Sequence, residues 1–257
     1  MNNNPIGVYD SGVGGLSVWQ ELRRVLPEES LLYLGDGKNC PYGSLSVEHI
    51  RQLAEESVEV LLSRGCKLIV VACNTATAAA IEHLRAKFSD IPFVGLEPAI
   101  KPACLTTKSG IVGVVATERS LTGDKFLKTL AKYGDGVKVI KSVGYGFVEA
   151  VECNAEQDAA TETLVRDVIE PIVEQGADSI VLGCTHYPFL REVIERVVGD
   201  RDVKIIDSGE AVGKRVESLL DEYDLRAEKS HQPTYEFITF ADEGYRIRLQ
   251  NKAFEVK

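Results

Sequence analysis

Residues 68–75 read Leu-Ile-Val-Val-Ala-Cys-Asn-Thr, and residues 179–186 read Ser-Ile-Val-Leu-Gly-Cys-Thr-His. Each stretch is a short apolar run that ends at a cysteine and continues into polar residues. A run this short, apolar at consecutive positions, is typical of a strand buried on both faces of a parallel sheet. The two stretches therefore predict two such strands, with Cys73 and Cys184 at their carboxyl ends.

Apolar runs of the same kind alternate with amphipathic stretches over the rest of the chain. We expect strands at residues 6–9, 31–34, 68–72, 93–96, 111–116, 137–143, 179–183, 203–206 and 235–240. We expect helices at residues 16–26, 47–63, 75–88, 123–130, 162–175, 189–198 and 210–223, with a short helix at the end. Pro171 could kink or break the helix that contains it. The alternation predicts an α/β fold whose mainly parallel sheets are covered by helices on both faces.

The strands and helices follow a similar order twice. Three pairs of residues that end corresponding strands share nearly one separation, of 107, 111 and 110 residues: Asp10 with Thr117, Cys73 with Cys184, and Glu97 with Asp207. We interpret this agreement as a pseudo-repeat of about half the chain. The alternative is a chance agreement among generic βα units. The repeat predicts two pseudo-symmetric α/β domains.

The repeat also predicts where chemistry would occur. In open α/β sheets, ligands bind beyond the carboxyl ends of the strands, so two domains facing each other would place Cys73 and Cys184 on opposite walls of one cleft. Racemisation removes a proton from one face of a carbon and returns a proton to the other face. A thiol has an ordinary pKa near about 8.5, so it can act as thiolate base or as thiol acid. The pair therefore predicts a two-base, cofactor-independent racemase.

Two neighbours could adjust these thiols. Asp10 should lie near Cys73 if the first strand pairs with residues 68–72, and its carboxylate would raise the thiol pKa and strengthen the base. His186, two residues after Cys184, could assist deprotonation or relay a proton. The alternatives are a loop-capping carboxylate, a histidine packed in its loop and two buried structural thiols.

An amino-acid substrate also needs partners for its carboxylate. Asn74-Thr75 and Thr185-His186 each open a predicted helix, where unpaired N–H groups favour a carboxylate. Hydroxyl and amide groups that could contribute belong to Ser11, Asn74, Thr75, Thr117 and Thr185. Pro41-Tyr42-Gly43 could close one side of the pocket, although an ordinary β-turn is the alternative. The glycines of residues 12–15 favour a nucleotide only weakly, because the segment lacks a full G-x-G-x-x-G pattern.

The composition limits the classes of partner. The chain has 257 residues and a formal net charge of −10, which disfavours the phosphate backbone of nucleic acids. No apolar stretch approaches the roughly 20 residues that span a bilayer, and the N-terminus lacks the pattern of a signal peptide. The six cysteines include no pair at zinc-ligand spacing, and we expect them to stay reduced. We therefore expect no nucleic-acid, membrane or metal partner.

Seven segments resemble the glutamate racemase family, within the aspartate/glutamate racemase superfamily. They are I-G-V-Y-D-S-G-V-G-G-L-S-V (6–18), G-D-G-K-N-C-P-Y-G (35–43), V-V-A-C-N-T-A-T-A (70–78), G-L-E-P-A (95–99), V-G-V-V-A-T (112–117), L-G-C-T-H-Y-P (182–188) and I-D-S-G-E-A-V (206–212). The C-N-T and C-T-H segments are typical of the whole superfamily. The D-S-G-x-G-G-L and P-Y-G segments point to the glutamate branch.

The resemblance implies a cytoplasmic enzyme, most simply a homodimer, that makes D-glutamate for peptidoglycan without a cofactor or metal. It implies a first domain of residues 1–97 with 208–257, and a second of residues 98–207. The implied catalytic residues are Cys73 and Cys184, with Asp10, His186 and Glu152 in support. The implied contacts of the substrate, glutamate, are Asp10, Ser11, Pro41, Tyr42, Gly43, Asn74, Thr75, Thr117, Thr185 and His186.

The sequence departs from the family pattern in the second domain. Gly144 and Tyr145 stand where Cys-Pro is usual, and Ser120, Gly123 and Phe126 replace the usual Thr, Ser and Tyr. These departures leave the choice between glutamate and aspartate open. A superfamily racemase acting on aspartate or a hydantoin is the nearest alternative. A non-catalytic amino-acid-binding protein and a redox protein with a Cys73–Cys184 disulfide are the others.

Overall fold

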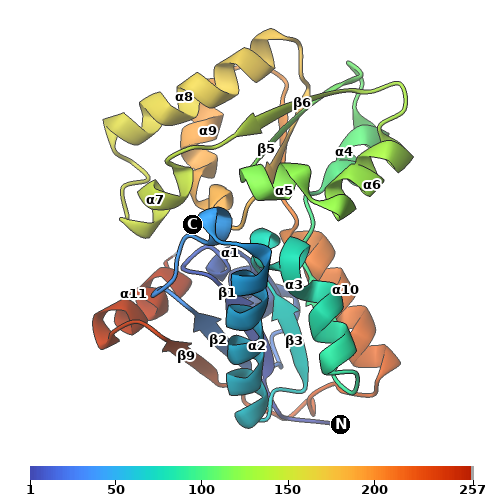
Figure 1. Cartoon of the computed structure of the whole chain (residues 1–257), viewed down its shortest axis with the longest axis vertical. Helices are drawn as coiled ribbons and strands as arrows, with labels where there is room; N and C mark the ends of the chain where they lie inside the picture. Colours follow the sequence, from blue (N-terminus) through green and yellow to red (C-terminus); the bar gives the residue numbers. More distant parts are fainter. Residues whose placement is uncertain (256–257) are drawn as a thin grey trace. The chain divides into compact units, whose positions relative to one another are not determined.

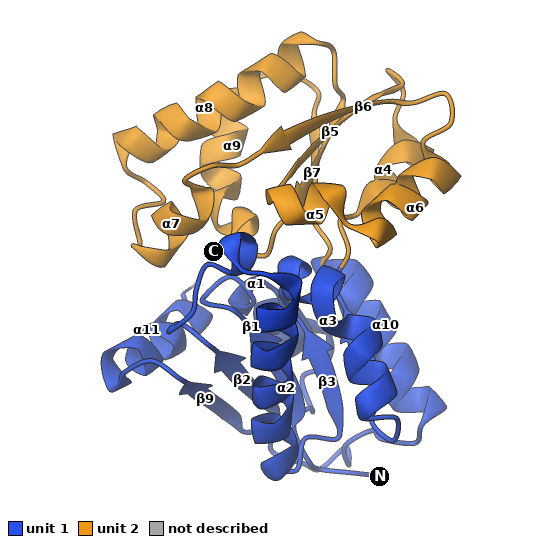
Figure 2. Ribbon diagram, in the orientation of Figure 1, with its two compact units in different colours: residues 1–96, 209–257 blue, residues 97–208 orange. Residues whose placement is uncertain are grey.

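The computed structural model describes residues 1–255 and divides the chain into two compact units (Figure 2). Unit 1 comprises Met1–Leu96 and the segment that begins at Gly209. Unit 2 comprises Glu97–Ser208. Each unit is built around its own sheet.

Unit 1 contains a five-stranded sheet in the order β4-β3-β1-β2-β9 (Figure 1), in which every pairing is parallel. Its strands are β1 (Ile6–Asp10), β2 (Leu31–Gly35), β3 (Leu68–Val71), β4 (Phe93–Gly95) and β9 (Tyr235–Thr239). Its helices are α1 (Leu16–Val25), α2 (Val47–Ser63), α3 (Asn74–Lys87), α10 (Gly209–Glu222) and α11 (Glu243–Ala253). Helices α2 and α3 pack together, and α1 packs against α10 and α11.

Unit 2 contains a four-stranded parallel sheet in the order β6-β5-β7-β8. Its strands are β5 (Ile111–Ala116), β6 (Lys138–Val143), β7 (Ser179–Gly183) and β8 (Lys204–Ile206). Its helices are α4 (Ile100–Thr106), α5 (Glu118–Thr122), α6 (Asp124–Tyr133), α7 (Phe147–Glu152), α8 (Ala159–Glu174) and α9 (Arg191–Val198). Helix α4 packs with α6, and α8 packs with α9.

The two sheets share one strand order. The order β4-β3-β1-β2 in unit 1 corresponds to β8-β7-β5-β6 in unit 2, and β9 extends only the first sheet. In unit 1, β3, which is followed by Cys73 after Ala72, pairs with β1. In unit 2, β7, which is followed directly by Cys184, pairs with β5. The predicted α/β class with mainly parallel sheets is confirmed, and the shared order supports the pseudo-repeat.

The central strands are apolar because helices cover both of their faces. All five residues of β1, β2 and β7 are buried, as are all four of β3. In the register of the first sheet, Tyr9 lies beside Leu34 on one side and Val71 on the other. Asp10, Asp36 and Cys73 therefore leave the sheet at the same edge.

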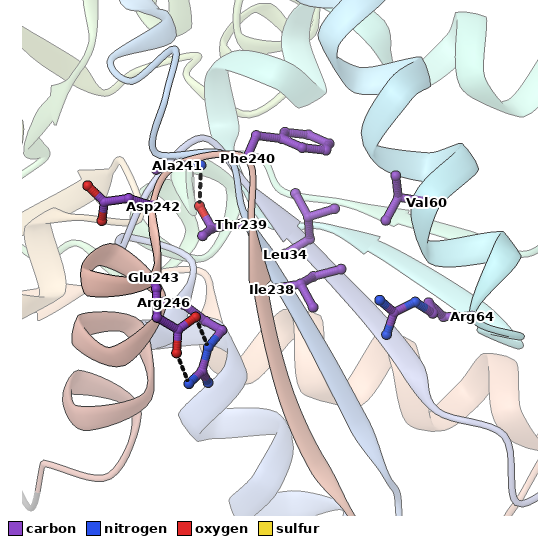
Figure 3. A pocket seen from close by; sticks show the side chains of 10 residues that line it. All are labelled: Leu34, Val60, Arg64, Ile238, Thr239, Phe240, Ala241, Asp242, Glu243 and Arg246. Carbon is purple, nitrogen blue, oxygen red and sulfur yellow. Dashed lines mark hydrogen bonds and ion pairs between the residues drawn. The ribbon is translucent and has the colours of Figure 1, made fainter.

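Strand β9 ends beside β2, where a cavity of about 280 Å³ lies over the sheet edge (Figure 3). Leu34, Val60, Ile238 and Phe240 form its apolar wall. The hydroxyl of Thr239 accepts the N–H of Ala241 at 3.0 Å and donates to the carbonyl of Asp36 at 3.1 Å. The end of β9 is thus tied to the loop that follows β2.

Three short helices were not predicted from the sequence. Helices α4, α5 and α7 have seven, five and six residues, which is too short for an apolar period to show. Pro171 lies inside α8, which continues unbroken to Glu174, so the break that we considered there does not occur. Among residues 1–255, no helix combines the length and the apolar character needed to cross a membrane.

We predict that Gly15→Ala destabilises unit 1. A Cβ at Gly15 would lie 2.6 Å from Cβ of Asp10 and 3.0 Å from Cβ of Ala72, and overpacking of this kind costs about 1–3 kcal/mol. Urea unfolding should show the loss. Gly43→Ala is the matched control, because its added Cβ meets no atom within 4 Å. Equal stability of the two variants would contradict the prediction.

Candidate active site

Cys73 caps the N-terminus of α3. The backbone N–H of Ala76 donates to its sulfur at 3.4 Å, and the sulfur lies 3.6 Å from the hydroxyl oxygen of Ser11. The side chain is buried. A helix N-terminus carries partial positive charge, which stabilises negative charge on an atom placed there. The position therefore favours a thiolate at Cys73.

Asp10 and Ser11 reach Cys73 because β1 pairs with β3. Asp10 is fully buried, and its Oδ1 accepts the N–H of Gly12 at 2.8 Å. The carboxylate therefore does stabilise the glycine turn, as the loop-capping alternative predicted. That contact still leaves Asp10 at the strand edge occupied by Ser11 and Cys73.

Asn74 and Thr75 form the first turn of α3, as predicted, and both are buried. The Nδ2 of Asn74 is buried and has no hydrogen-bond acceptor among the described residues. A buried donor without an acceptor costs about 1–3 kcal/mol. A carboxylate bound at this helix N-terminus would supply the acceptor.

The turn of Pro41, Tyr42 and Gly43 follows the β2 exit. The Cys40–Pro41 peptide bond is cis, and a 3₁₀ turn covers Tyr42–Ser44. The Tyr42 side chain is buried, and its hydroxyl donates to Oδ2 of Asp36 at 2.7 Å. Burial, with Tyr9 and Asp36 nearby, raises the pKa of Tyr42, so the hydroxyl stays protonated. Tyr42 therefore offers a ligand only its backbone.

Unit 2 places a histidine and a carboxylate beside the second cysteine. Cys184 follows β7, and its sulfur lies 3.8 Å from Nδ1 of His186. The other ring nitrogen of His186, Nε2, lies 2.7 Å from Oε1 of Glu152, at the end of α7. All three residues were predicted as catalytic, and the structure brings them together in one unit.

The partners of His186 assign its protons. A carboxylate only accepts, so Nε2 carries the hydrogen, and Nδ1 of the neutral ring is left as an acceptor facing the thiol. Cys184 can therefore pass its proton to His186, and Glu152 stabilises the imidazolium that forms.

The remaining predicted residues of unit 2 have local partners. Thr117 caps α5, and its Oγ1 accepts the N–H of Ser120 at 3.3 Å and lies 2.9 Å from that residue's hydroxyl. Thr185 is buried, and the helix predicted to open at Thr185-His186 is a short 3₁₀ helix at Tyr187–Leu190 whose N-cap is His186. Helix α9 begins only at Arg191.

The departures from the family pattern now have a partial explanation. A Cβ at Gly144 would lie 2.7 Å from the hydroxyl oxygen of Tyr187, which donates to the Gly144 carbonyl at 3.2 Å. Only glycine fits that contact. Phe126 is buried in the core of unit 2, Gly123 links α5 to α6, and Tyr145 is 69% exposed. The structure gives no reason for the tyrosine.

Two of the other cysteines, Cys66 and Cys104, lie in the apolar cores of their units. Burial raises the pKa of Cys66 to about 12 and raises that of Cys104. Cys153 is exposed, and Cys40 is half-buried before the cis peptide bond. Cys73 and Cys184 differ from Cys66 and Cys104 because each follows a strand and lies beside a polar side chain.

One connection was not predicted from sequence. The hydroxyl of Tyr9 donates to that of Tyr42 at 2.8 Å, so a chain runs from β1 through Tyr42 to Asp36. A tyrosine in an apolar strand looks like an ordinary core residue. No spacing signal pairs it with a turn that is 33 residues away.

Comparisons with known proteins agree with the resemblance. Residues 15–215 match the family described as Asp/Glu/Hydantoin racemase. The chain is 45% identical over 250 residues to the glutamate racemase of Herpetosiphon aurantiacus, covering 97% of this chain and 98% of that protein. It resembles the crystal structure of glutamate racemase isoform RacE1 from Bacillus anthracis, with a TM-score of 0.85 and 34% identity; the match covers 98% of this chain and 94% of that chain. It also resembles the crystal structure of glutamate racemase from Francisella tularensis in complex with D-glutamate, with a TM-score of 0.84 and 27% identity; the match covers 100% of this chain and 95% of that chain.

We predict that Cys66 resists alkylation in the folded protein. With a pKa of about 12, about one thiol in 10,000 is ionised at pH 8, and the thiolate is the reactive form. Iodoacetamide treatment followed by peptide mass spectrometry should label exposed Cys153 first and Cys66 only after unfolding. Labelling of Cys66 as fast as Cys153 in the folded state would contradict the raised pKa.

Proposed function

The chain belongs to the Asp/Glu/hydantoin racemase family and to its glutamate racemase branch, and we propose that it interconverts L- and D-glutamate through Cys73 and Cys184. One observation carries the proposal. The two sheets have the same strand order, and in each sheet the corresponding strand is followed by a cysteine. The sulfur of Cys73 accepts an N–H at a helix N-terminus, which supports a thiolate, and the sulfur of Cys184 faces His186, which can take its proton. Such a pair suits proton transfer in both directions.

The proposed reaction is a two-base transfer. One thiolate removes the α-proton of glutamate, and the other cysteine, as thiol, donates a proton to the opposite face of the planar carbanion. The C–H bond that breaks leaves its electron pair on the α-carbon, and the new C–H bond uses that pair. The mechanism requires both sulfurs to reach one α-carbon, and the roles of the thiols reverse with the enantiomer. It needs no cofactor.

The two thiols are activated by different means. Cys184 reaches the thiolate form by giving its proton to Nδ1 of His186, and the Glu152 carboxylate stabilises the resulting imidazolium. The Cys73 thiolate is supported by the N-terminus of α3 and by the hydroxyl of Ser11. Asp10, which is buried at the same strand edge, strengthens this thiolate as a base.

The N-terminus of α3 is the proposed site of a substrate carboxylate. The unpaired Nδ2 of Asn74 and the hydroxyl of Thr75 supply donors there. The related Francisella protein is described as a complex with D-glutamate, and we carry that ligand to this chain. The further proposed contacts are Asp10, Ser11, Pro41, Tyr42, Gly43, Thr117, Thr185 and His186, with Tyr42 acting through its backbone.

The proposal places the enzyme in the cytoplasm as a homodimer, where it supplies D-glutamate for peptidoglycan. These points rest on the resemblance to glutamate racemases. The alternative substrate is aspartate, because the family includes aspartate and hydantoin racemases.

We predict that Cys73→Ser and Cys184→Ser each lower racemisation by about 10²–10⁴-fold, because each removes one acid–base group. Circular dichroism with D- or L-glutamate and no added cofactor measures the rate. Each variant should still exchange the α-proton of one enantiomer in D2O, and the two variants should differ in which one. Cys153→Ser, at an exposed cysteine, is the control and should match the wild type.

Three outcomes would count against the proposal. If the wild type racemises aspartate but not glutamate, glutamate is not its substrate. Glutamate binding without turnover would support the binding-protein alternative. Full activity in either cysteine variant would exclude the two-base mechanism.

A further inference from the structure

Tyr9 contacts both the strand end that carries Cys73 and the turn of residues 41–43. The side chain is fully buried in β1, and the backbone carbonyl accepts the N–H of Ala72 at 2.7 Å. Ala72 directly precedes Cys73. The ring lies in the same apolar cluster as Tyr42 and Cys73, with its centroid 6.4 Å from that of Tyr42. A shift of Tyr9 would therefore move the surroundings of both residues.

The Tyr9 hydroxyl begins a directed chain of hydrogen bonds. It donates to the Tyr42 hydroxyl at 2.8 Å, and Tyr42 donates to Oδ2 of Asp36 at 2.7 Å. Asn39 donates to both carboxylate oxygens of Asp36 at 3.0 Å. Tyr9, Tyr42 and Asp36 are all buried. Loss of the middle hydroxyl would leave a buried donor and a buried acceptor each without this partner.

The acceptor end of the chain is held by backbone contacts. The N–H of Asp36 donates to the carbonyl of Asp10 at 3.0 Å, and the carbonyl of Asp36 accepts from Thr239. Thr239 lines the cavity at the end of β9 (Figure 3). Because Asp36 is fixed to β1 and β9, the hydroxyl chain also fixes Tyr42 and the turn around it.

We propose that Tyr9 and Tyr42 are positioning residues, which hold the Pro41–Gly43 turn at a set place relative to Cys73. The inference rests on the proposed function, because the turn must bind glutamate for its place to matter. Both hydroxyls donate to buried protein groups, that of Tyr9 to Tyr42 and that of Tyr42 to Asp36, so we assign them no contact with the substrate. A displaced turn weakens substrate binding and leaves the proton transfer itself unchanged. The effect therefore falls on KM and spares kcat.

The test is a double-mutant cycle with full kinetics in both directions. Tyr42→Phe should raise KM roughly tenfold for both enantiomers, because it removes one hydrogen bond to a charged group. The kcat of this variant should stay within about twofold of the wild-type value. Tyr9→Phe should raise KM less, because the Tyr42–Asp36 bond remains. The double variant should be no worse than Tyr42→Phe, since the Tyr9 hydroxyl has then already lost its acceptor.

Thr161→Val is the matched control for a purely structural effect. The Thr161 hydroxyl is buried in unit 2 and donates to the carbonyl of Ala155 at 2.7 Å, so its loss should lower the melting temperature and leave KM unchanged. Thermal denaturation of all variants confirms folding. If Tyr42→Phe does not fold, Tyr9→Phe decides the matter.

The outcomes separate the two claims. Unchanged KM in a folded Tyr42→Phe or Tyr9→Phe variant, or a fall in kcat with KM constant, overturns the positioning role while wild-type racemisation still stands. Additive effects of the two substitutions would also overturn it, because the hydroxyls would then act separately. A wild type that neither binds nor racemises glutamate overturns the proposed function, and the inference falls with it.

Discussion

Parallel pairing in register is the constraint on which the rest of the structure depends. Because β1 pairs with both β2 and β3 and all three run the same way, the residues that follow them leave the sheet at one edge. The pairing of the strands brings Ser11, Asp36 and Cys73, which are far apart in sequence, to that edge. The same arrangement in unit 2 places Thr117 and Cys184 after paired strands. The sheets bring the polar residues together, and the local contacts then give each residue its role.

Repetition of the fold does not repeat the chemistry. Both cysteines end corresponding strands, yet one sulfur accepts a helix N–H, whereas the other faces a histidine that is itself held by a carboxylate. In the proposed mechanism, the N-terminus of α3 stabilises the thiolate of Cys73, and the thiolate of Cys184 forms when its proton passes to His186. Under the proposed mechanism each thiol is the base for only one enantiomer, so the two environments need not be alike.

The sequence predicted those strands and helices whose apolar pattern spans several residues. It did not predict features that depend on the contacts of a single side chain. Apolar runs located the strands, and α2 was predicted to the residue at Val47–Ser63. The β1–β3 pairing that was expected to bring Asp10 to Cys73 is present. Helices shorter than two turns left no periodic signal, and the sequence did not reveal that the helix opening at Thr185-His186 is a separate 3₁₀ helix. The inward direction of Tyr42 depends on a partner in β1, which no local pattern reveals.

The central claim is that two different groups act on opposite faces of one carbon, and the fate of the α-proton tests it most directly. L-glutamate should be racemised in D2O, the reaction stopped at low conversion, and the α-position of substrate and product examined by NMR. The account predicts D-glutamate that carries deuterium at the α-carbon, while unreacted L-glutamate keeps its protium, because the donating thiol holds a solvent-derived deuteron. Product that retains the original protium would show one group carrying a single proton across, and would contradict the account.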